Sequence, residues 1–233
     1  MVDWVGEKLF NKYGSKAVEV WDGYMKKFGL GVSTESGLPN EHKGIIEYTN
    51  IEQAGSYLAA MAYASFGQSG KYTTLQLAQY ATMLANQGAR IKPQLASKIV
   101  DQNGKVVKKF GREVLNQEKF PQQYWNEVIQ GMNTQNLRAF EDFPYDFARK
   151  TGTSEQEIYK NGRRDIVDNG VFIAFAPRQN PKLAVAVVIP EGGFGSQSAA
   201  PVARKIFDAY DEIYGLDGTP HPKNKDEQEG NGE

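Results

Sequence analysis

Hydrophobic residues recur every three or four positions in several stretches of the chain, and this spacing places them on one face of a helix. We expect helices in the following stretches: two short ones within residues 1–30, then 52–65, 73–87, 121–132 and 198–215. In 121–132 the residues Tyr124, Val128 and Met132 are in register on one face, and in 198–215 the face expected toward the sheet is Val202, Ile206, Ala209 and Ile213. The helix over 73–87 should end at Gly88, which suits the left-handed position after a helix.

Two continuous apolar runs, Val171–Ala176 and Leu183–Ile189, have the length of strands. Because they are apolar throughout, both are expected to be covered on both faces. The link over residues 177–182 is too short for a parallel crossover, so the pair is predicted to be antiparallel. Phe147–Thr153 is expected to form a further strand.

A separate hairpin is expected within residues 94–110, because Asn103-Gly104 favours a type I′ turn with positive φ at both central residues. Helices and antiparallel strands together indicate the α+β class, an antiparallel sheet flanked by helices. From Asp217 the composition changes to proline, glycine, asparagine, lysine and acids. We therefore expect one folded portion over residues 1–216 and a disordered polar tail over 217–233.

Composition and charge narrow the function only slightly. The formal net charge of -1 gives no electrostatic reason to expect a nucleic-acid partner. The absence of cysteine excludes disulfides and thiol catalysis. The two histidines are His42 and His221, and the second lies in the expected tail, so no metal site or cofactor is expected. No apolar run approaches the roughly 20 residues of a membrane span.

The chemically informative segment is Lys150-Thr151-Gly152-Thr153. On a strand, Lys150 and Gly152 point to one face and the two threonines to the other. An ammonium group and two hydroxyls this close together can bind a carboxylate, and glycine allows a ligand to approach the backbone. Taken alone, the same residues also fit an exposed edge strand with solvated polar groups.

The neighbouring sequence favours the first interpretation. Lys-Thr-Gly followed by Thr resembles the third signature of the serine penicillin-recognising enzymes. Further segments resemble class B penicillin-binding proteins in the same order: Phe28–Gly31, Leu38–Glu41, Phe66–Gln68, Thr73–Ala78, Ala85–Gly88 and Ala200–Val202. Ser69 and Thr74 depart from the family pattern, where a glycine and a proline stand. The resemblance covers roughly residues 25–215.

The resemblance implies a partial β-lactamase/transpeptidase-like fold and a role for each residue of the motif. Lys150 would supply positive charge and a proton-relay contact. Thr151 and Thr153 would bind the terminal carboxylate of a D-Ala-D-Ala stem peptide or of a β-lactam, with Gly152 between them. The Thr153 backbone N–H would form half of an oxyanion hole. The implied reaction is acyl transfer through a serine ester, as in a peptidoglycan D,D-transpeptidase.

The family also needs a Ser-x-x-Lys nucleophile motif and a Ser-x-Asn motif, and no serine of this chain has lysine three places on or asparagine two places on. Tyr48-Thr49-Asn50 imitates a variant of the second motif, but it follows the Phe28–Gly31 landmark, so we interpret it as coincidence. We therefore expect the chain to start mid-domain, to be inactive alone, and to have the missing N-terminal part of the domain as a partner. The parent protein is expected at the extracytoplasmic face of the bacterial membrane.

Two alternatives remain open at this stage. A D,D-carboxypeptidase or a β-lactam sensor would share the fold and differ in the acceptor or in the rate of deacylation. A module without catalytic activity that binds D-Ala-D-Ala or a protein partner would need the binding strand alone.

Overall fold

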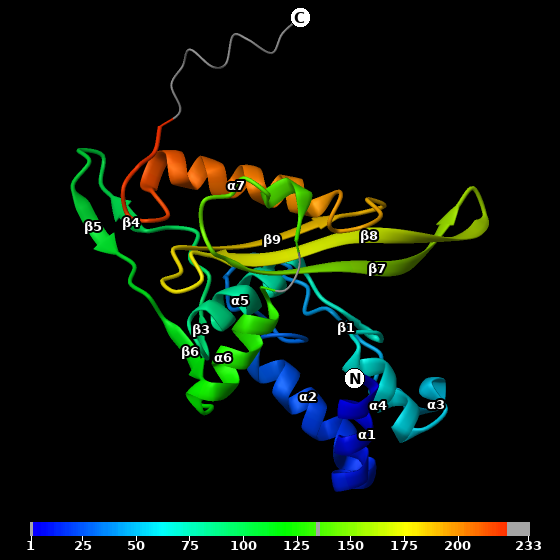
Figure 1. Cartoon of the computed structure of the whole chain (residues 1–233). Helices are drawn as coiled ribbons and strands as arrows, with labels where there is room; N and C mark the ends of the chain where they lie inside the picture. Colours follow the sequence, from blue (N-terminus) through cyan, green and yellow to red (C-terminus); the bar gives the residue numbers. More distant parts are fainter. Residues whose placement is uncertain (1, 134–135, 223–233) are drawn as a thin grey trace, which may run out of the picture. The chain divides into compact units, whose positions relative to one another are not determined.

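The computed structural model describes residues 2–133 and 136–222, and the chain divides into two compact units (Figure 1). Unit 1 comprises residues 1–83 and 88–119, and unit 2 comprises 84–87 and 120–233. Each unit has its own cluster of buried hydrophobic residues. No helix among the described residues is long and apolar enough to cross a membrane.

Unit 1 is mainly helical. Its elements are α1 (Val2–Tyr13), the 3-10 turn η1 (Gly14–Lys16), α2 (Ala17–Lys27), β1 (Ile45–Ile46), α3 (Ile51–Ala54), α4 (Tyr57–Ser65), β2 (Gly70–Lys71), α5 (Thr74–Ala85), β3 (Ala89–Ile91), β4 (Lys98–Val100), β5 (Val106–Lys109) and β6 (Val114–Gln117). The two helices expected within residues 1–30 and the helix expected over 73–87 are confirmed.

The single helix expected over 52–65 is wrong, because the chain breaks between α3 and α4. Gly55 adopts a left-handed conformation with φ 82° and ends α3. Ser56 then caps α4, its hydroxyl oxygen accepting a hydrogen bond from the Ala59 N–H at 3.1 Å. A left-handed glycine followed by a serine cap stops one helix and starts the next, and both signals outweigh the apolar pattern.

The loop over residues 32–43, which contains the Leu38–Glu41 segment, is fixed by buried polar side chains. Gln76 of α5 is fully buried, and its amide donates to two backbone carbonyl oxygens of this loop at 2.7 and 3.0 Å. Glu41 accepts a backbone N–H at 2.7 Å and two serine hydroxyls at 3.1 Å. Although burial acts to raise the pKa of Glu41, these hydrogen bonds outweigh it and hold the pKa below its usual range.

The hairpin expected within 94–110 is confirmed as β4 and β5, which pair antiparallel. The type I′ turn is wrong, because Gly104 has the positive φ of 79° and Asn103 does not. Instead the Asp101 carboxylate accepts the N–H groups of Asn103 and Lys105, each at 2.9 Å, and shapes a wider turn. The antiparallel pairing of β3 with β6 was not predicted.

Unit 2 contains α6 (Gln122–Gly131), the 3-10 turn η2 (Arg138–Phe140), β7 (Ala148–Lys160), β8 (Arg163–Ala176), β9 (Leu183–Ile189) and α7 (Ala199–Tyr214). The three strands form an antiparallel sheet in the order β7-β8-β9, and α7 packs on one face of it (Figure 1). This arrangement confirms the predicted α+β class and the antiparallel pairing of the two apolar strands. The β7–β8 hairpin is longer than predicted and closes at Asn161-Gly162, with φ values of 53° and 75°.

The two helices of unit 2 were predicted in the right places, but the face of α7 that was expected toward the sheet is wrong. In α7 the buried residues are Ala199, Ala200, Ala203 and Phe207, whereas the predicted face of Val202, Ile206, Ala209 and Ile213 is exposed. In α6 Trp125 and Ile129 are buried, while Tyr124 and Val128 are exposed; of the residues in register on one face only Met132, just past the helix end, is buried. Alanine side chains are small and allow α7 to lie close to the sheet. Its buried face is therefore the one with the alanines and not the one with the larger aliphatic residues.

The expectation that both apolar strands are covered on both faces holds for one face only. Phe172 and Ala174 of β8 are fully buried beneath α7. On the other face Phe175 is buried, but Val171 and Ile173 are half-exposed.

Part of the predicted tail is folded. Residues 217–222 make hydrogen bonds at the end of α7, including the His221 N–H to the Asp211 carbonyl oxygen at 3.0 Å. The rest of the predicted tail, 223–233, lies outside the described residues.

Candidate functional site

The Lys150–Thr153 motif lies near the start of β7, at one edge of the sheet that the described residues form. Thr151 pairs with the buried Phe172 and is half-buried, whereas Lys150 and Thr153 are exposed. The alternation expected from the sequence is therefore present, with Lys150 and Gly152 on the face opposite α7. Among the described strands β7 pairs on one side only, and on its other side the Arg149 backbone N–H donates to the Met132 carbonyl oxygen at 2.7 Å.

Two side chains of the motif, those of Lys150 and Thr153, are exposed. Lys150 Nζ donates to the Thr151 carbonyl oxygen at 2.6 Å, so the ammonium folds back along its own strand. In an exposed position this bond can exchange for one to an incoming carboxylate at small cost. Among the described residues no group of three or more histidine, aspartate or glutamate side chains could hold a metal ion.

Aromatic side chains fix the start of β7. Phe147 stacks on Phe140 with ring centroids 4.5 Å apart and is buried. Arg149 lies over the Phe147 ring at 4.5 Å, and its N–H donates to the Met132 carbonyl oxygen at 2.7 Å. Burial lowers the pKa of Arg149, and the nearby Asp146 opposes that effect. Buried aromatic side chains therefore fix the position of the first residues of β7.

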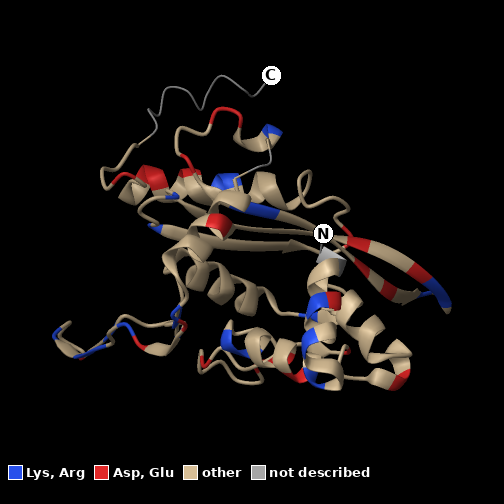
Figure 2. Ribbon diagram, turned by 60° about the horizontal axis from the view of Figure 1, so that its bottom comes forward, with Lys and Arg blue, Asp and Glu red and all other residues tan. Residues whose placement is uncertain are grey.

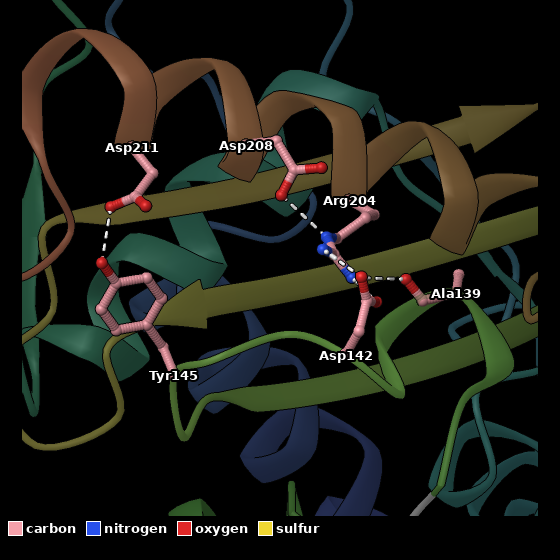
Figure 3. Close-up of polar contacts among 6 residues, drawn as sticks. All are labelled: Ala139, Asp142, Tyr145, Arg204, Asp208 and Asp211. Atoms are coloured by element: carbon pink, nitrogen blue, oxygen red, sulfur yellow. Dashed lines mark hydrogen bonds and ion pairs between the residues drawn. The ribbon is translucent and has the colours of Figure 1, made fainter. Parts of the chain in front are cut away.

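Arg204 of α7 binds the loop that precedes β7 and so connects this loop to the helix (Figure 3). Its guanidinium binds Asp142 at 2.5 Å and Asp208 at 2.7 Å, and donates to the Ala139 carbonyl oxygen at 3.1 Å. The hydrogen bond from Arg204 lowers the pKa of Asp142.

About two turns further along α7, Asp211 accepts a hydrogen bond from the Tyr145 hydroxyl at 2.8 Å (Figure 3). Burial and the Asp211 carboxylate raise the pKa of Tyr145. This hydroxyl therefore stays protonated as a donor and fixes the loop to the end of the helix.

A second segment, residues 191–198, packs directly on the motif through glycines. A Cβ added at Gly195 would collide with the carbonyl oxygens of Gly152 and Val171, so the backbone there can approach only because Gly195 has no side chain. Gly170, the partner of Thr153, is similarly covered by the Ser198 hydroxyl. We name residues 191–198 the glycine clamp.

Hydrogen bonds to Asp168 and Asn169 of β8 hold the glycine clamp in place. The Gly193 N–H donates to the Asp168 carbonyl oxygen at 2.9 Å. The Glu191 N–H donates to the side chain of Asn169 at 3.1 Å, and Asn169 in turn binds Gln156 of β7 at 3.1 Å. The sequence analysis missed this segment, although three glycines within Gly192–Gly195 were a signal of close backbone packing.

The residues that imitate the second family motif have structural roles. Tyr48 is buried, and its hydroxyl donates to Asp22 at 3.1 Å. The Asn50 side chain caps α3 by accepting the Gln53 N–H at 3.2 Å. Both side chains are thereby engaged within unit 1, which agrees with the interpretation of the match as coincidence.

Comparison with known proteins gives consistent results. The penicillin binding protein transpeptidase domain model matches residues 2–208. Penicillin-binding protein 2A of Bacillus subtilis is 33% identical over 240 residues, covering 94% of this chain and 32% of the relative. The peptidoglycan D,D-transpeptidase MrdA of Haemophilus influenzae is 34% identical over 212 residues, covering 80% of this chain and 32% of the relative. The chain thus spans about a third of the length of these relatives.

Solved structures show the same likeness. Penicillin-binding protein 2B of Streptococcus pneumoniae strain R6 matches with a TM-score of 0.69 and 26% identity, over 91% of this chain and 34% of that one. Penicillin-binding protein A of Mycobacterium tuberculosis, solved as an imipenem acyl-enzyme complex, matches with a TM-score of 0.65 and 26% identity, over 79% of this chain and 40% of that one.

Proposed function

Since the chain belongs to the penicillin-binding protein transpeptidase domain family, we propose that it forms part of a peptidoglycan D,D-transpeptidase. The parent enzyme transfers an acyl group from a D-Ala-D-Ala stem peptide and is acylated by β-lactams. The observation that carries the proposal is the Lys150–Thr153 motif, with Lys150 and Thr153 exposed, on a strand at the edge of the described sheet. Arg204 holds the loop before this strand, and Gly195 packs against Gly152. The parent acts at the extracytoplasmic face of the bacterial membrane, where its substrate lies.

Each residue of the motif has a role in this proposal. The Thr151 and Thr153 hydroxyls bind the substrate carboxylate, and Lys150 adds positive charge close to it. Gly152 keeps the strand free of a side chain where the peptide approaches. The Thr153 N–H helps to stabilise the oxyanion of the tetrahedral intermediate. The acyl bond itself forms on a serine outside these 233 residues, because no serine here has the lysine neighbour of the family motif.

The exposed stripe of α7 supports a second part of the proposal. Val202 and Ile206 are each 40% exposed and Ile213 is 61% exposed, one above the other on the helix. The strand β9 also lies at a sheet edge among the described strands. We propose that a further part of the same domain covers this stripe and edge in the parent protein. The substitution Ile206→Asp should then lower parent stability by about 3 kcal/mol, yet change that of this chain by under about 0.5 kcal/mol.

The activity is tested on the parent and on the chain together. Benzylpenicillin should add its mass to one serine of the parent, and intact-mass spectrometry should find no adduct on this chain. Replacing Thr153 by valine in the parent removes one charge-assisted hydrogen bond of about 1.5–3 kcal/mol, so the second-order acylation rate should fall about ten- to a hundredfold.

Three outcomes would contradict parts of this proposal. A parent that benzylpenicillin leaves unmodified would argue for a binding module without catalysis. A stoichiometric adduct on a serine of this chain would contradict the assignment of the nucleophile. An unchanged rate in Thr153→Val would remove that hydroxyl from the site. Once acylation is established, transfer to an amine acceptor rather than to water distinguishes a transpeptidase from a carboxypeptidase.

A further inference from the structure

The β4–β5 hairpin of unit 1 carries a concentration of positive charge that the rest of the chain lacks. Between Lys98 and Arg112 there are five basic side chains and one acidic side chain, in a chain whose formal net charge is -1. The basic residues are Lys98, Lys105, Lys108, Lys109 and Arg112. In Figure 2 blue segments, which mark Lys and Arg, lie along this hairpin at the left of the view. We name residues 98–112 the basic arm.

The positive charges of the basic arm are not neutralised internally. Asp101, its one acid, accepts two backbone N–H groups in the turn. Glu113, just beyond it, pairs with Lys92 at 3.1 Å. No ion pair in the described part of the chain involves the five basic side chains. Lys98 even lies directly opposite Lys109 in the strand register, an arrangement that destabilises a hairpin in isolation.

The same arm exposes apolar side chains and unpaired strand edges. Val107 is 67% exposed, and Ile99, Val100, Val106 and Phe110 are also exposed. Each strand pairs only with the other among the described residues, so both outer edges are open. An isolated two-stranded hairpin is marginal in water, and a partner that bridges the lysines and covers the valines would stabilise it.

We propose that the basic arm binds un-crosslinked peptidoglycan strands through residues other than those of the Lys150–Thr153 motif. This inference rests on the proposed function, which makes peptidoglycan the substrate. Free stem peptides carry carboxylates beside alanine methyl groups, so one ligand satisfies both the lysines and the exposed aliphatic side chains. An extended peptide can also pair along an open strand edge through its backbone. The arm holds the polymer that bears the substrate and raises its local concentration.

The test is co-sedimentation of the full 233-residue chain with purified un-crosslinked peptidoglycan. The variant K98Q/K105Q/K108Q/K109Q should bind about tenfold more weakly or worse, and wild-type binding should weaken as salt rises. The control K8Q/K12Q/K16Q/K119Q removes the same charge from exposed positions elsewhere in unit 1 and should bind within about twofold of wild type. Circular dichroism melting confirms that both variants remain folded.

Several results would overturn the inference. Wild-type chain that fails to sediment with peptidoglycan would do so, as would equal losses in the arm and control variants. Binding to phosphatidylglycerol vesicles that needs the same lysines, with none to peptidoglycan, would instead identify a lipid surface. The outcome is independent of catalysis, because a parent that is never acylated would refute the proposed activity while leaving lysine-dependent sedimentation of this chain intact.

Discussion

The β4–β5 hairpin and the β7–β8 hairpin each turn at an Asn-Gly dipeptide, but their strands have different surroundings. All residues of β4 and β5 are exposed. In the β7–β8 hairpin α7 covers the part of β8 that contains Phe172 and Ala174, and both of these residues are fully buried. Only the second hairpin has positive φ at both turn residues.

This difference separates two ways of keeping a strand in place. The motif strand β7 and the loop before it are held by residues far away in the sequence, the glycine clamp and Arg204. The basic arm is held by its own turn and two short strands, so its order depends on what surrounds it. Catalytic geometry needs the first kind of support, whereas capture of a polymer tolerates the second.

The largest contrast should appear when one hydrophobic side chain is cut back in each hairpin. Phe172→Ala leaves a cavity beneath α7 and should lower the free energy of unfolding by about 3–5 kcal/mol. Val107→Ala, at an exposed position, should change it by under about 0.5 kcal/mol. Urea denaturation followed by circular dichroism measures both. Similar losses in the two variants would show that the basic arm is packed in solution.

The glycine clamp gives the next largest effect. Gly195→Ala forces a Cβ onto backbone oxygens of β7 and β8, and overpacking of this kind costs about 1–3 kcal/mol. Amide hydrogen exchange should accelerate at residues 150–153 in particular. The control Gly131→Ala meets no atom within 4 Å and should leave these amides unchanged. Uniform acceleration across unit 2 would mean that the clamp stabilises the fold without positioning the strand.

A smaller effect should follow from reversing one charge in the basic arm. Lys98→Glu places a carboxylate opposite Lys109 and should stabilise the hairpin by about 0.2–1 kcal/mol relative to the like-charged pair. Slower hydrogen exchange in β4 and β5 would record it. Lys8→Glu on α1 makes the same change of net charge and should not alter that exchange. Unchanged exchange in Lys98→Glu would contradict the repulsion that we infer.

The smallest effect concerns pH and the support of β7. Because Arg204 lowers the folded-state pKa of Asp142 below its ordinary value of 3.8, the stability from this pair is present above that value. It is lost as pH falls through the folded pKa. Asp142→Asn should therefore show a shallower fall in melting temperature under acid conditions than wild type. Glu141→Gln removes a neighbouring exposed carboxylate and should keep the wild-type slope.

The sequence predicted the motif strand, the apolar hairpin and most helices, because each depends on a local pattern. It misplaced the buried face of α7, since that helix is apolar on two sides and periodicity selects the larger side chains. The sheet instead receives Ala199, Ala200 and Ala203, whose small size is decisive only when the opposing surface is known. It likewise used Asn103-Gly104 as a turn signal and overlooked Asn161-Gly162, where the polar strands hid the pattern.

The candidate site divides in the same way. Lys150, Thr151, Gly152 and Thr153 were identified from adjacent residues and a family resemblance, and their roles stay predictions. The residues that hold the motif in place include Gly195 and Arg204, which lie more than forty positions after Thr153 in the sequence. No local pattern relates these residues to the motif, because the contact exists only after β8, β9 and α7 have assembled.

The helix α7 contacts the motif strand's surroundings at two points, with Arg204 in its middle and the glycine clamp leading into its first turn. A displacement of α7 would therefore also displace the loop before β7 and the segment that packs on Gly152. The exposed stripe of Val202 and Ile206 lies on this same helix, on the side that faces away from the sheet. The part of the parent that we propose covers this stripe would therefore also hold the helix that supports β7.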